Sequence, residues 1–445
     1  MYRFPSSPNP HLYLLGIGGV GMVWLADYAL AQGWKVSGVD TGGTTVTTKR
    51  LEDAGATIHY TCSPELIPAD VTESVMSSAI TPTSALYGEY QALVGRGIVP
   101  VKRAVATGAL TRRYRTIAVA GTHGKTTTTA MIGWIFTVAG LDPTVFVGGS
   151  IKAWNGATKI GKSRLLILEA DEFDRSFHQF RAEAAVLLNL EADHLECYPG
   201  GVPEIEHSFK RFLRNLPHRK GLVVAYGKSP SLRRVVKGFS YKLRWYSADT
   251  LWVGLPKNLA GNHVRLNATA AARVAHEYGI SNAIIKKALA TFPGVDRRME
   301  EMGELGACRW IDDYAHHPTE VAATLQVLAE RASGERKVVV FQPHQLTRTK
   351  LLLEQFSRCF DSNPPDELIL APIFTVPGRE QGIEVSSGDI AAGIARKAPK
   401  GMRVSVAESD TQLLQMIEVA TIQPGILLSM SAGDLRSKLQ DYAGK

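Results

Sequence analysis

Apolar residues near the start of the chain come in short runs that predict alternating strands and helices. Residues 12–15 form an apolar run typical of a buried strand, and a glycine-rich turn follows it directly. We expect a helix from this turn to about Gln32, where Gly33 ends it, and a second strand at residues 36–39. Similar alternation continues to about Val101. This order of strand, turn, helix and strand predicts an α/β domain.

The pattern begins again after a basic connector at residues 102–115. Residues 116–120 predict the first strand of a second α/β unit, and residues 165–168 and 185–188 predict further buried strands. The segment from 179 to 220 is expected to be largely helical after a Pro-Gly-Gly break. We therefore expect a second sheet with its own helices in the middle of the chain.

A third change of pattern follows the Pro-Gly-Val-Asp-Arg-Arg segment at residues 293–298. Beyond it, apolar runs at 337–341, 367–371 and 425–430 alternate with helical patterns, which predicts another mainly parallel sheet. The economical interpretation is three α/β domains. Their predicted boundaries are residues 1–105, 106–296 and 297–445.

Composition favours a cytoplasmic enzyme. Apolar residues make up 45% of the 445 positions, no run of 18 uncharged apolar residues occurs, and the first ten residues lack the pattern of a signal peptide. The four cysteines, Cys62, Cys197, Cys308 and Cys359, are far apart and show no metal-binding spacing. We expect them to be reduced thiols.

The net charge is +8, and its basic residues concentrate at 96–115 and 210–244. Solvated surfaces explain these segments, because no interleaved aromatic residues and no known nucleic-acid module accompany them. The functional alternative is attraction of polyanionic small molecules, which nucleotide substrates satisfy. We expect no nucleic-acid partner, no membrane insertion, and a monomer or a homodimer.

The turn after the first strand has the sequence Gly16-Ile17-Gly18-Gly19-Val20-Gly21. Glycines at its first, third and sixth positions permit a tight turn and close approach to a phosphate, while N–H groups of the following helix face the anion. Asp40 ends the second strand, where its carboxylate could accept a hydrogen bond from a ribose. The motif does not select the nucleotide, so an NAD or FAD enzyme and a purely structural turn both stay open.

A second glycine loop, Gly121-Thr122-His123-Gly124-Lys125-Thr126, follows the strand predicted at 116–120. It is shorter than the Walker pattern, but its N–H groups still form an anion nest and Lys125 brings a positive charge to the terminal phosphates. The hydroxyl of Thr126 is a candidate Mg²⁺ ligand. Threonines continue through residues 127–129, and because β-branched residues start helices poorly, ligand contacts explain this run better than folding does. Two loops of different types predict two bound nucleotides.

Acidic residues follow two of the predicted strands. Glu169, Asp171 and Glu172 come after the strand at 165–168, and His194 follows the next one. Open α/β sheets bind ligands at this end of their strands. Mg²⁺ prefers oxygen, so a carboxylate is the natural ligand, and His194 would be an additional, unusual one or else a hydrogen-bonded loop residue.

Motifs spread over nearly the whole chain resemble those of the Mur ligase family. In order they are A-G-T-H-G-K-T-T at 120–127, E-A-D-E at 169–172, E-A-D-H at 191–194, G-V-D-R-R at 294–298, D-D-Y-A-H-H-P-T-E at 312–320, Q-P-H at 342–344 and S-A-G-D at 431–434.

The resemblance implies a Rossmann-like N-terminal domain for a UDP-sugar, a central P-loop ATPase domain with a mainly parallel sheet, and a Rossmann-like C-terminal domain that closes over an amino acid. It implies an ATP- and Mg²⁺-dependent ligase that joins L-alanine to the carboxylate of UDP-N-acetylmuramate through an acyl phosphate, in peptidoglycan precursor synthesis. The runs at 191–194 and 341–349 are more similar to this activity than to the family members that recycle a murein tripeptide onto the same UDP-sugar. Those ligases are the first alternative.

The family's functional positions fall on the following residues of this chain. The UDP-sugar would contact Gly18, Gly19, Val20, Asp40 and Ser78. ATP would contact Gly121, Thr122, His123, Gly124, Lys125, Thr126, Thr127, Asn267 and Arg297. Mg²⁺ would be held by Thr126, Glu169 and His194. The catalytic residues would be Lys125, His316, His344 and Arg348.

Some positions depart from the family pattern, and other functions compete. The departures are Phe173, Val264, Ala315 and Gln345, which flank the expected substrates. A nicotinamide-dependent oxidoreductase explains the first glycine loop but leaves Lys125 without a role. An ATP-driven nucleic-acid motor would suit the basic charge, yet the sequence carries no helicase-like motif set.

Overall fold

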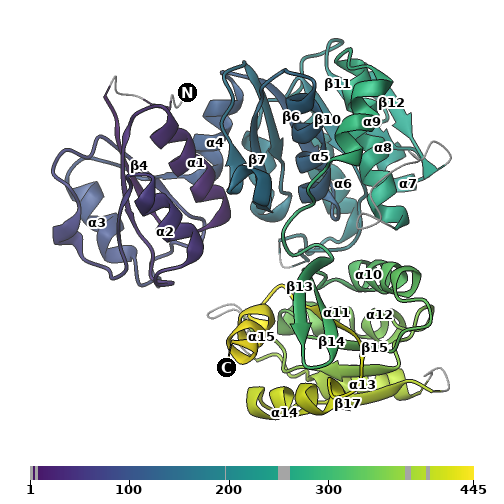
Figure 1. The fold of residues 1–445 in the computed structure, drawn as a ribbon. Coiled ribbons are helices and arrows are strands. Elements are labelled where there is room, and N and C mark those ends of the chain that lie inside the picture. The colour runs from purple at the N-terminus through teal and green to yellow at the C-terminus, as the bar shows by residue number, and fades with distance from the viewer. Residues whose placement is uncertain are drawn as a thin grey trace. The chain divides into compact units, whose positions relative to one another are not determined.

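The computed structural model describes residues 4–5, 9–195, 197–248, 261–375, 382–396 and 401–444. They form three separate sheets with helices around them (Figure 1). The chain divides into two compact units, one comprising Met1–Pro256 and Leu266–Val295, the other Lys257–Arg265 and Asp296–Lys445. The first unit holds two of the sheets and the second unit holds the third.

The first sheet is parallel throughout, in the order β3-β2-β1-β4-β5. Its strands are β1 (His11–Leu15), β2 (Lys35–Val39), β3 (Thr57–His59), β4 (Glu73–Met76) and β5 (Val101–Lys102). Its helices are α1 (Val20–Ala31), α2 (Val46–Asp53), the short η1 (Pro64–Leu66) and α3 (Tyr87–Gly95). The strand order reverses between β1 and β4, and ligands bind at such a switch point in open α/β sheets. The predicted Rossmann-like start is confirmed.

The segment predicted as a basic connector, residues 102–115, is instead mostly helical. Helix α4 spans Arg103–Thr111, and its small and apolar residues are buried. A Cβ on Gly108 of this helix would lie 2.5 Å from the backbone oxygen of Gln179, so the helix packs very closely on the central domain. The basic residues of this segment lie at the two ends of the helix, and for this reason its apolar middle was not predicted from the sequence.

The second sheet has the order β12-β11-β10-β6-β9-β7-β8, and only the β7–β8 pair is antiparallel. Its strands are β6 (Arg115–Ala120), β7 (Thr144–Ile151), β8 (Gly156–Lys159), β9 (Leu165–Glu169), β10 (Ala184–Leu187), β11 (Leu222–Tyr226) and β12 (Lys242–Tyr246). The accompanying helices are α5 (Lys125–Val138), η2 (Lys152–Trp154), η3 (Phe173–Gln179), α6 (Val202–Leu213), α7 (Pro230–Val236), α8 (Asn262–Glu277) and α9 (Asn282–Ala290). The predicted strands are confirmed, and α6 begins directly after the Pro-Gly-Gly break.

The third sheet has the order β13-β14-β18-β15-β16-β17, with only β13 antiparallel to its neighbour. Its strands are β13 (Glu300–Leu305), β14 (Cys308–Asp313), β15 (Lys337–Phe341), β16 (Glu367–Leu370), β17 (Arg403–Val406) and β18 (Gly425–Met430). Its helices are α10 (Pro318–Arg331), α11 (Leu346–Leu351), α12 (Leu353–Arg358), α13 (Ser387–Ala395), α14 (Asp410–Ala420) and α15 (Leu435–Ala443). The predicted mainly parallel sheet is confirmed. Across the described ranges, no helix combines the length and the apolar character needed to cross a bilayer.

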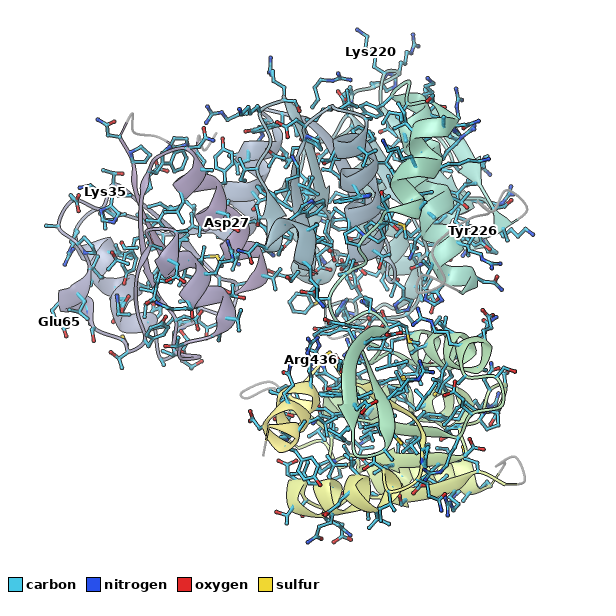
Figure 2. All side chains as sticks on the ribbon, viewed as in Figure 1. Asp27, Lys35, Glu65, Lys220, Tyr226 and Arg436 are labelled. Atoms are coloured by element: carbon cyan, nitrogen blue, oxygen red, sulfur yellow. The ribbon has the colours of Figure 1, made fainter. Side chains whose placement is uncertain are left out.

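The basic segment at 210–244 is partly neutralised by acidic neighbours. Arg234 donates to Glu206 at 2.6 Å, and Arg244 donates to Glu277 at 2.7 Å. Lys220 is exposed and projects away from the ribbon (Figure 2). These contacts favour the interpretation of this segment as a solvated surface.

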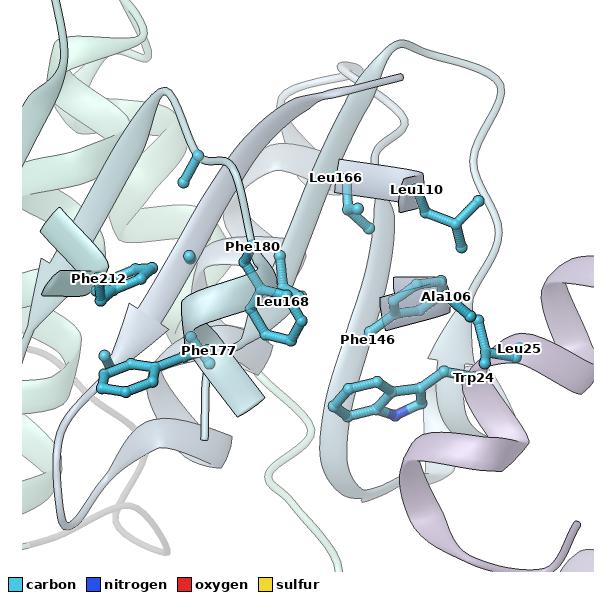
Figure 3. Packing of buried hydrophobic residues seen from close by; sticks show 14 of the residues in the cluster. Trp24, Leu25, Ala106, Leu110, Phe146, Leu166, Leu168, Phe177, Phe180 and Phe212 are labelled. Carbon is cyan, nitrogen blue, oxygen red and sulfur yellow. The ribbon is translucent and has the colours of Figure 1, made fainter. Parts of the chain in front are cut away.

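One continuous core joins the two sheets of the first unit. Trp24 of α1 stacks on Phe146 of β7 with ring centroids 5.6 Å apart, and its indole N–H donates to the carbonyl of Val147 at 2.8 Å. Leu25 and Leu110, from α1 and α4, belong to the same cluster (Figure 3). Because aromatic rings bury much apolar surface, this stack is a main stabilising contact between the two layers.

We predict that Trp24→Ala lowers the melting temperature of the first unit by several degrees. Loss of a buried aromatic side chain costs about 3 kcal/mol or more, and here the Val147 carbonyl also loses its donor. Differential scanning calorimetry would measure the shift. The control is Val46→Ala, because Val46 is 90% exposed and its truncation should leave the transition in place.

Candidate active site

The second glycine loop joins β6 to α5 at the carboxyl end of its strand. Gly121 has φ of 146° and Gly124 has φ of 80°, in the left-handed region where a side chain is strained. Gly124 is the N-cap of α5. A Cβ at Gly124 would lie 2.5 Å from the side-chain oxygen of Asn267, so only glycine fits between the loop and α8. Asn267, a predicted ATP contact, therefore lies directly against the loop.

Asn189 holds the loop in place from the end of β10. The backbone N–H of His123 donates to its Oδ1 at 2.7 Å, and its Nδ2 donates to the carbonyl of His123 at 3.0 Å. Nearby, the N–H of Glu191 donates to the Thr122 hydroxyl at 3.0 Å. No role is predicted for Asn189 from the sequence. Its place directly after a buried strand was the available signal.

Lys125 lies among carboxylates beneath the loop. Its Nζ is 2.8 Å from Oε2 of Glu172 and 3.5 Å from Oδ1 of Asp171, and it also donates to the carbonyl of Thr122 at 3.3 Å. Burial by itself lowers the pKa of Lys125, but the charges of Glu172, Asp171 and Glu169 outweigh it and raise the pKa above its ordinary value. Lys125 is therefore a permanent cation at neutral pH.

Glu169 ends β9 and faces the start of α5. The Thr126 hydroxyl donates to its two carboxylate oxygens at 3.0 and 3.2 Å, and the N–H of Gly148 donates to Oε2 at 2.7 Å. A Cβ at Gly148 would lie 2.4 Å from the same oxygen, so a glycine is required there. Burial raises the pKa of Glu169, and the positive charge of Lys125 opposes that rise. Two of the three predicted metal ligands, Thr126 and Glu169, are thus in contact.

His194, the third predicted ligand, belongs to a neighbouring group of donors. Each residue of the group offers one ligand atom, and these atoms all lie within 4.8 Å of one another; the residues are Asp171, Glu172 and His194. Phe173 packs edge-on against His194, with ring centroids 5.1 Å apart. Asp171 and Glu172 are not among the metal ligands predicted from the sequence, although both belong to the acidic run at 169–172.

The donors of this group fit a hard divalent cation. Oε1 of Glu172 is buried and has no hydrogen-bond partner among the described residues, an unfavourable state that a bound cation would relieve. Two carboxylates accompany the single imidazole, and Mg²⁺ prefers such oxygen donors. The lower pKa of Asp171 follows from Lys125 and His194, whose charges outweigh the effect of its burial.

The threonine run at the start of α5 does not face a ligand along its whole length. Thr128 and Thr129 are fully buried. The interpretation of these two side chains as ligand contacts is therefore wrong, because the helix turns them into the interior of the domain. Thr126 and Thr127 remain partly exposed on the loop side.

The first glycine loop is braced by Asp40. The N–H of Gly18 donates to its Oδ2 at 2.7 Å, and the N–H of Gly42 donates to its Oδ1 at 2.9 Å. A Cβ at Gly18 would lie 2.8 Å from Oδ2. Asp40 thus connects the loops that follow β1 and β2, a structural task beside the ribose contact expected from the sequence.

The other predicted sugar-nucleotide contacts surround the switch point of the first sheet. Gly19 and Val20 are exposed at the start of α1, and Ser78 is exposed in the loop that follows β4. Because β1 and β4 are parallel neighbours, these residues share the carboxyl edge of the sheet. This edge is where such sheets bind nucleotides.

In the second unit, residues after β14 and β15 converge at one edge of the third sheet. The rings of His316 and His344 lie 5.8 Å apart between centroids. His344 also stacks on Phe374 at 5.3 Å, and Nη1 of Arg348 lies 3.3 Å from its Nδ1. Burial, with the charges of His316 and Arg348, lowers the pKa of His344 to about 3, so this imidazole is neutral. Phe374 was not among the predicted residues.

Arg297, a predicted ATP contact, lies in the second unit with φ of 59°. Its Nη2 donates to the carbonyl of Ser431 at 2.7 Å, its Nε lies 3.4 Å from Oδ2 of Asp312, and its guanidinium covers the ring of Tyr314 at 4.9 Å. These contacts position the loop between β14 and α10. They explain the basic pair at 297–298 in structural terms, and nucleotide binding by Arg297 stays a prediction.

Three family models match successive parts of this chain: the Mur ligase family catalytic domain at residues 11–115, the Mur ligase middle domain at 119–255, and the Mur ligase glutamate ligase domain at 297–433. The UDP-N-acetylmuramate–L-alanine ligase of Nitrosomonas eutropha is 34% identical over 96% of this chain and 95% of its own length. The enzyme of the same name from Desulfosudis oleivorans is 35% identical over 96% of both chains.

Solved structures show the same fold. The UDP-N-acetylmuramate-alanine ligase of Thermotoga maritima superposes with a TM-score of 0.78 at 22% identity, covering 98% of both chains. A murein peptide ligase from Psychrobacter arcticus gives a TM-score of 0.72 at 22% identity, covering 97% of this chain and 98% of its own. With the near full-length relatives and the motif order, this agreement shows that the chain belongs to the Mur ligase family.

Proposed function

We propose that the chain is an ATP-dependent ligase that joins L-alanine to the carboxylate of UDP-N-acetylmuramate, in peptidoglycan precursor synthesis. The relatives with this name match it over nearly their whole length. The observation that carries the proposal is Lys125, a buried cation held among three carboxylates where a phosphate-binding loop leads into α5. An oxidoreductase would have no use for this arrangement.

The first step requires two anions to meet. The sugar carboxylate attacks the γ-phosphoryl group of ATP, and the oxygens of both repel each other unless positive charge lies between them. Lys125 supplies such a charge, and the N–H groups of the loop other than that of His123, which donates to Asn189, would bind the phosphates. Asn189 fixes the loop, so these donors are oriented before the substrate arrives. The product of the step is an acyl phosphate and ADP.

We assign the Mg²⁺ ligands to Thr126 and Glu169 and to the group of Asp171, Glu172 and His194. Bound there, Mg²⁺ would act as a Lewis acid that neutralises phosphate charge. The unpartnered Oε1 of Glu172 and the contact between Thr126 and Glu169 support this assignment.

In the second step, the amino acid reacts with the acyl phosphate. Its neutral amine attacks the acyl carbon, and phosphate leaves. Arg348 would bind the carboxylate of the amino acid, because a guanidinium matches a carboxylate with two parallel hydrogen bonds. His344, with a pKa of about 3, would accept or donate a hydrogen bond and hold a proton only weakly. We therefore propose that His344 orients the amino acid, with His316 beside it.

We predict that the purified chain, given ATP, Mg²⁺ and UDP-N-acetylmuramate, releases ADP only when an amino acid is added, and fastest with L-alanine. Coupled ADP assays with L-alanine, glycine, L-serine and a murein tripeptide in turn would measure this. Faster turnover of the tripeptide would replace the proposal with the recycling ligase, whose structural representative also shares the fold.

Lys125→Ala should lower kcat by roughly a hundredfold or more, because removal of one preorganised donor to the transition state costs about 3 kcal/mol. The rate of ADP formation at saturating substrates is the measurement. Lys162→Ala is the matched control, since Lys162 is an exposed lysine of the same domain. Near wild-type turnover of the Lys125 variant would remove the loop from the mechanism.

His194→Ala should raise the Mg²⁺ concentration needed for half-maximal activity by about tenfold, a size typical for disturbed metal shells. Mn²⁺ binding followed by electron paramagnetic resonance would show the same loss without turnover. His218→Ala is the control, because His218 is exposed elsewhere on the central domain. An unchanged titration for His194→Ala would return that residue to a loop-stabilising role.

A further inference from the structure

Arg103 occupies a place that no motif identified. It is the first residue of α4 and directly follows β5. Since β5 pairs in parallel with β4, Arg103 lies at the same carboxyl edge of the first sheet as the glycine loop after β1 and the loop that carries Ser78. That edge is where a sugar nucleotide would bind.

The side chain of Arg103 lies against the first turn of α1. A Cβ on Gly21 would meet its Cδ at 2.6 Å, its Nη1 at 2.7 Å and its Nε at 2.9 Å. The absence of a side chain at the sixth position of the glycine motif leaves room for the guanidinium. A cation at this end of a helix is unfavourable on its own, because the free N–H groups there already carry partial positive charge.

No counter-ion within contact balances this charge. Among the described residues, Arg103 has no hydrogen bond and no ion pair. Arg50, which also packs on α1, is held by two bonds of 2.9 Å to Asp27. Burial lowers the pKa of Arg103, although the charges of Asp171 and Asp174 oppose this shift. Of these two carboxylates, Asp171 also lies 3.5 Å from Lys125.

Arg103 therefore contacts the first glycine loop and lies within electrostatic range of a carboxylate beside the second. Its side chain contacts Gly21 of the first loop and interacts electrostatically with Asp171, whose Oδ1 lies 3.5 Å from Nζ of Lys125. The proposed reaction brings an anionic sugar nucleotide to ATP. This nucleotide is a suitable ligand for the guanidinium of Arg103, which has no ion pair among the described residues. The sugar nucleotide offers two oxyanions, its diphosphate and its reacting carboxylate.

We propose that Arg103 binds an oxyanion of the sugar nucleotide at the start of α1, and so positions the substrate relative to the ATP site. The proposal rests on the proposed function, because it takes UDP-N-acetylmuramate as the ligand. A guanidinium is suited to the task, since it presents parallel N–H donors to carboxylate or phosphate oxygens.

The test compares Arg103→Gln with Arg112→Gln in the full chain. Arg112 is exposed at the other end of α4, so its variant removes the same charge from the same helix without reaching the edge of the sheet. Calorimetric titration with UDP and with UDP-N-acetylmuramate should show affinity reduced by about ten- to a hundredfold for Arg103→Gln, the usual effect of losing a charge-assisted hydrogen bond. Arg112→Gln should bind as the wild type does.

Comparison of UDP with UDP-N-acetylmuramate shows whether Arg103 binds the diphosphate or the carboxylate. Equal loss for UDP and UDP-N-acetylmuramate assigns Arg103 to the diphosphate, and loss for UDP-N-acetylmuramate alone assigns it to the carboxylate. Either result supports the proposal, provided that the KM for ATP stays within about twofold of the wild-type value. Arg103→Lys keeps the positive charge but lacks the parallel N–H donors of a guanidinium, so it should bind more tightly than Arg103→Gln and more weakly than the wild type. If Arg103→Gln does not fold, Arg103→Lys takes its place in the comparison.

Unchanged affinity for both ligands would overturn the proposal, as would a parallel rise in the KM for ATP, because general disruption of the first unit would affect both substrates. Failure of the proposed function has a different signature. In that case the wild-type chain itself would not bind UDP-N-acetylmuramate or turn it over with L-alanine.

Discussion

The structure of the site depends on an imbalance of charge around Lys125. One ammonium faces Glu169, Asp171 and Glu172, and it lies 2.8 Å from the last of these. Burial raises the pKa of both glutamates, and the negative charge of Asp171 raises it further, while Lys125 opposes both effects. A triphosphate would be repelled by this surplus of negative charge. We infer that the pocket accepts ATP only together with a divalent cation, and that Lys125 exchanges a carboxylate for a phosphate as the nucleotide binds.

Rigid backbone makes this charge arrangement useful. Gly148 and Gly124 allow side chains of Glu169 and Asn267 to approach the backbone closely, and Asn189 ties the loop to the end of β10. The parallel strands β6, β9 and β10 are neighbours, so their carboxyl ends bring these groups to one edge without long loops. Donors fixed in this way need little reorganisation during phosphoryl transfer.

The sequence predicted what depends on local pattern. Strands with apolar runs, both glycine loops and the acidic run after β9 could be located because each shows itself within a few residues. Asn189 escaped notice because its partner is a backbone segment 66 positions away. Arg103 escaped for the same kind of reason, since its meaning comes from contact with Gly21 on another helix. Long-range packing also made residues 103–111 a helix and buried Thr128 and Thr129.

In the second unit, the electrostatic requirement concerns the charge of the amino acid. The amino acid must give up a proton before its amine becomes a nucleophile, and ammonium is the dominant form in water. Arg348 is buried and positively charged, while His344 beside it is neutral. A buried guanidinium favours binding of the carboxylate, and its positive charge lowers the pKa of an amine held close to it. We infer that the site itself promotes loss of the amine proton to solvent, so that neither histidine has to serve as a strong base.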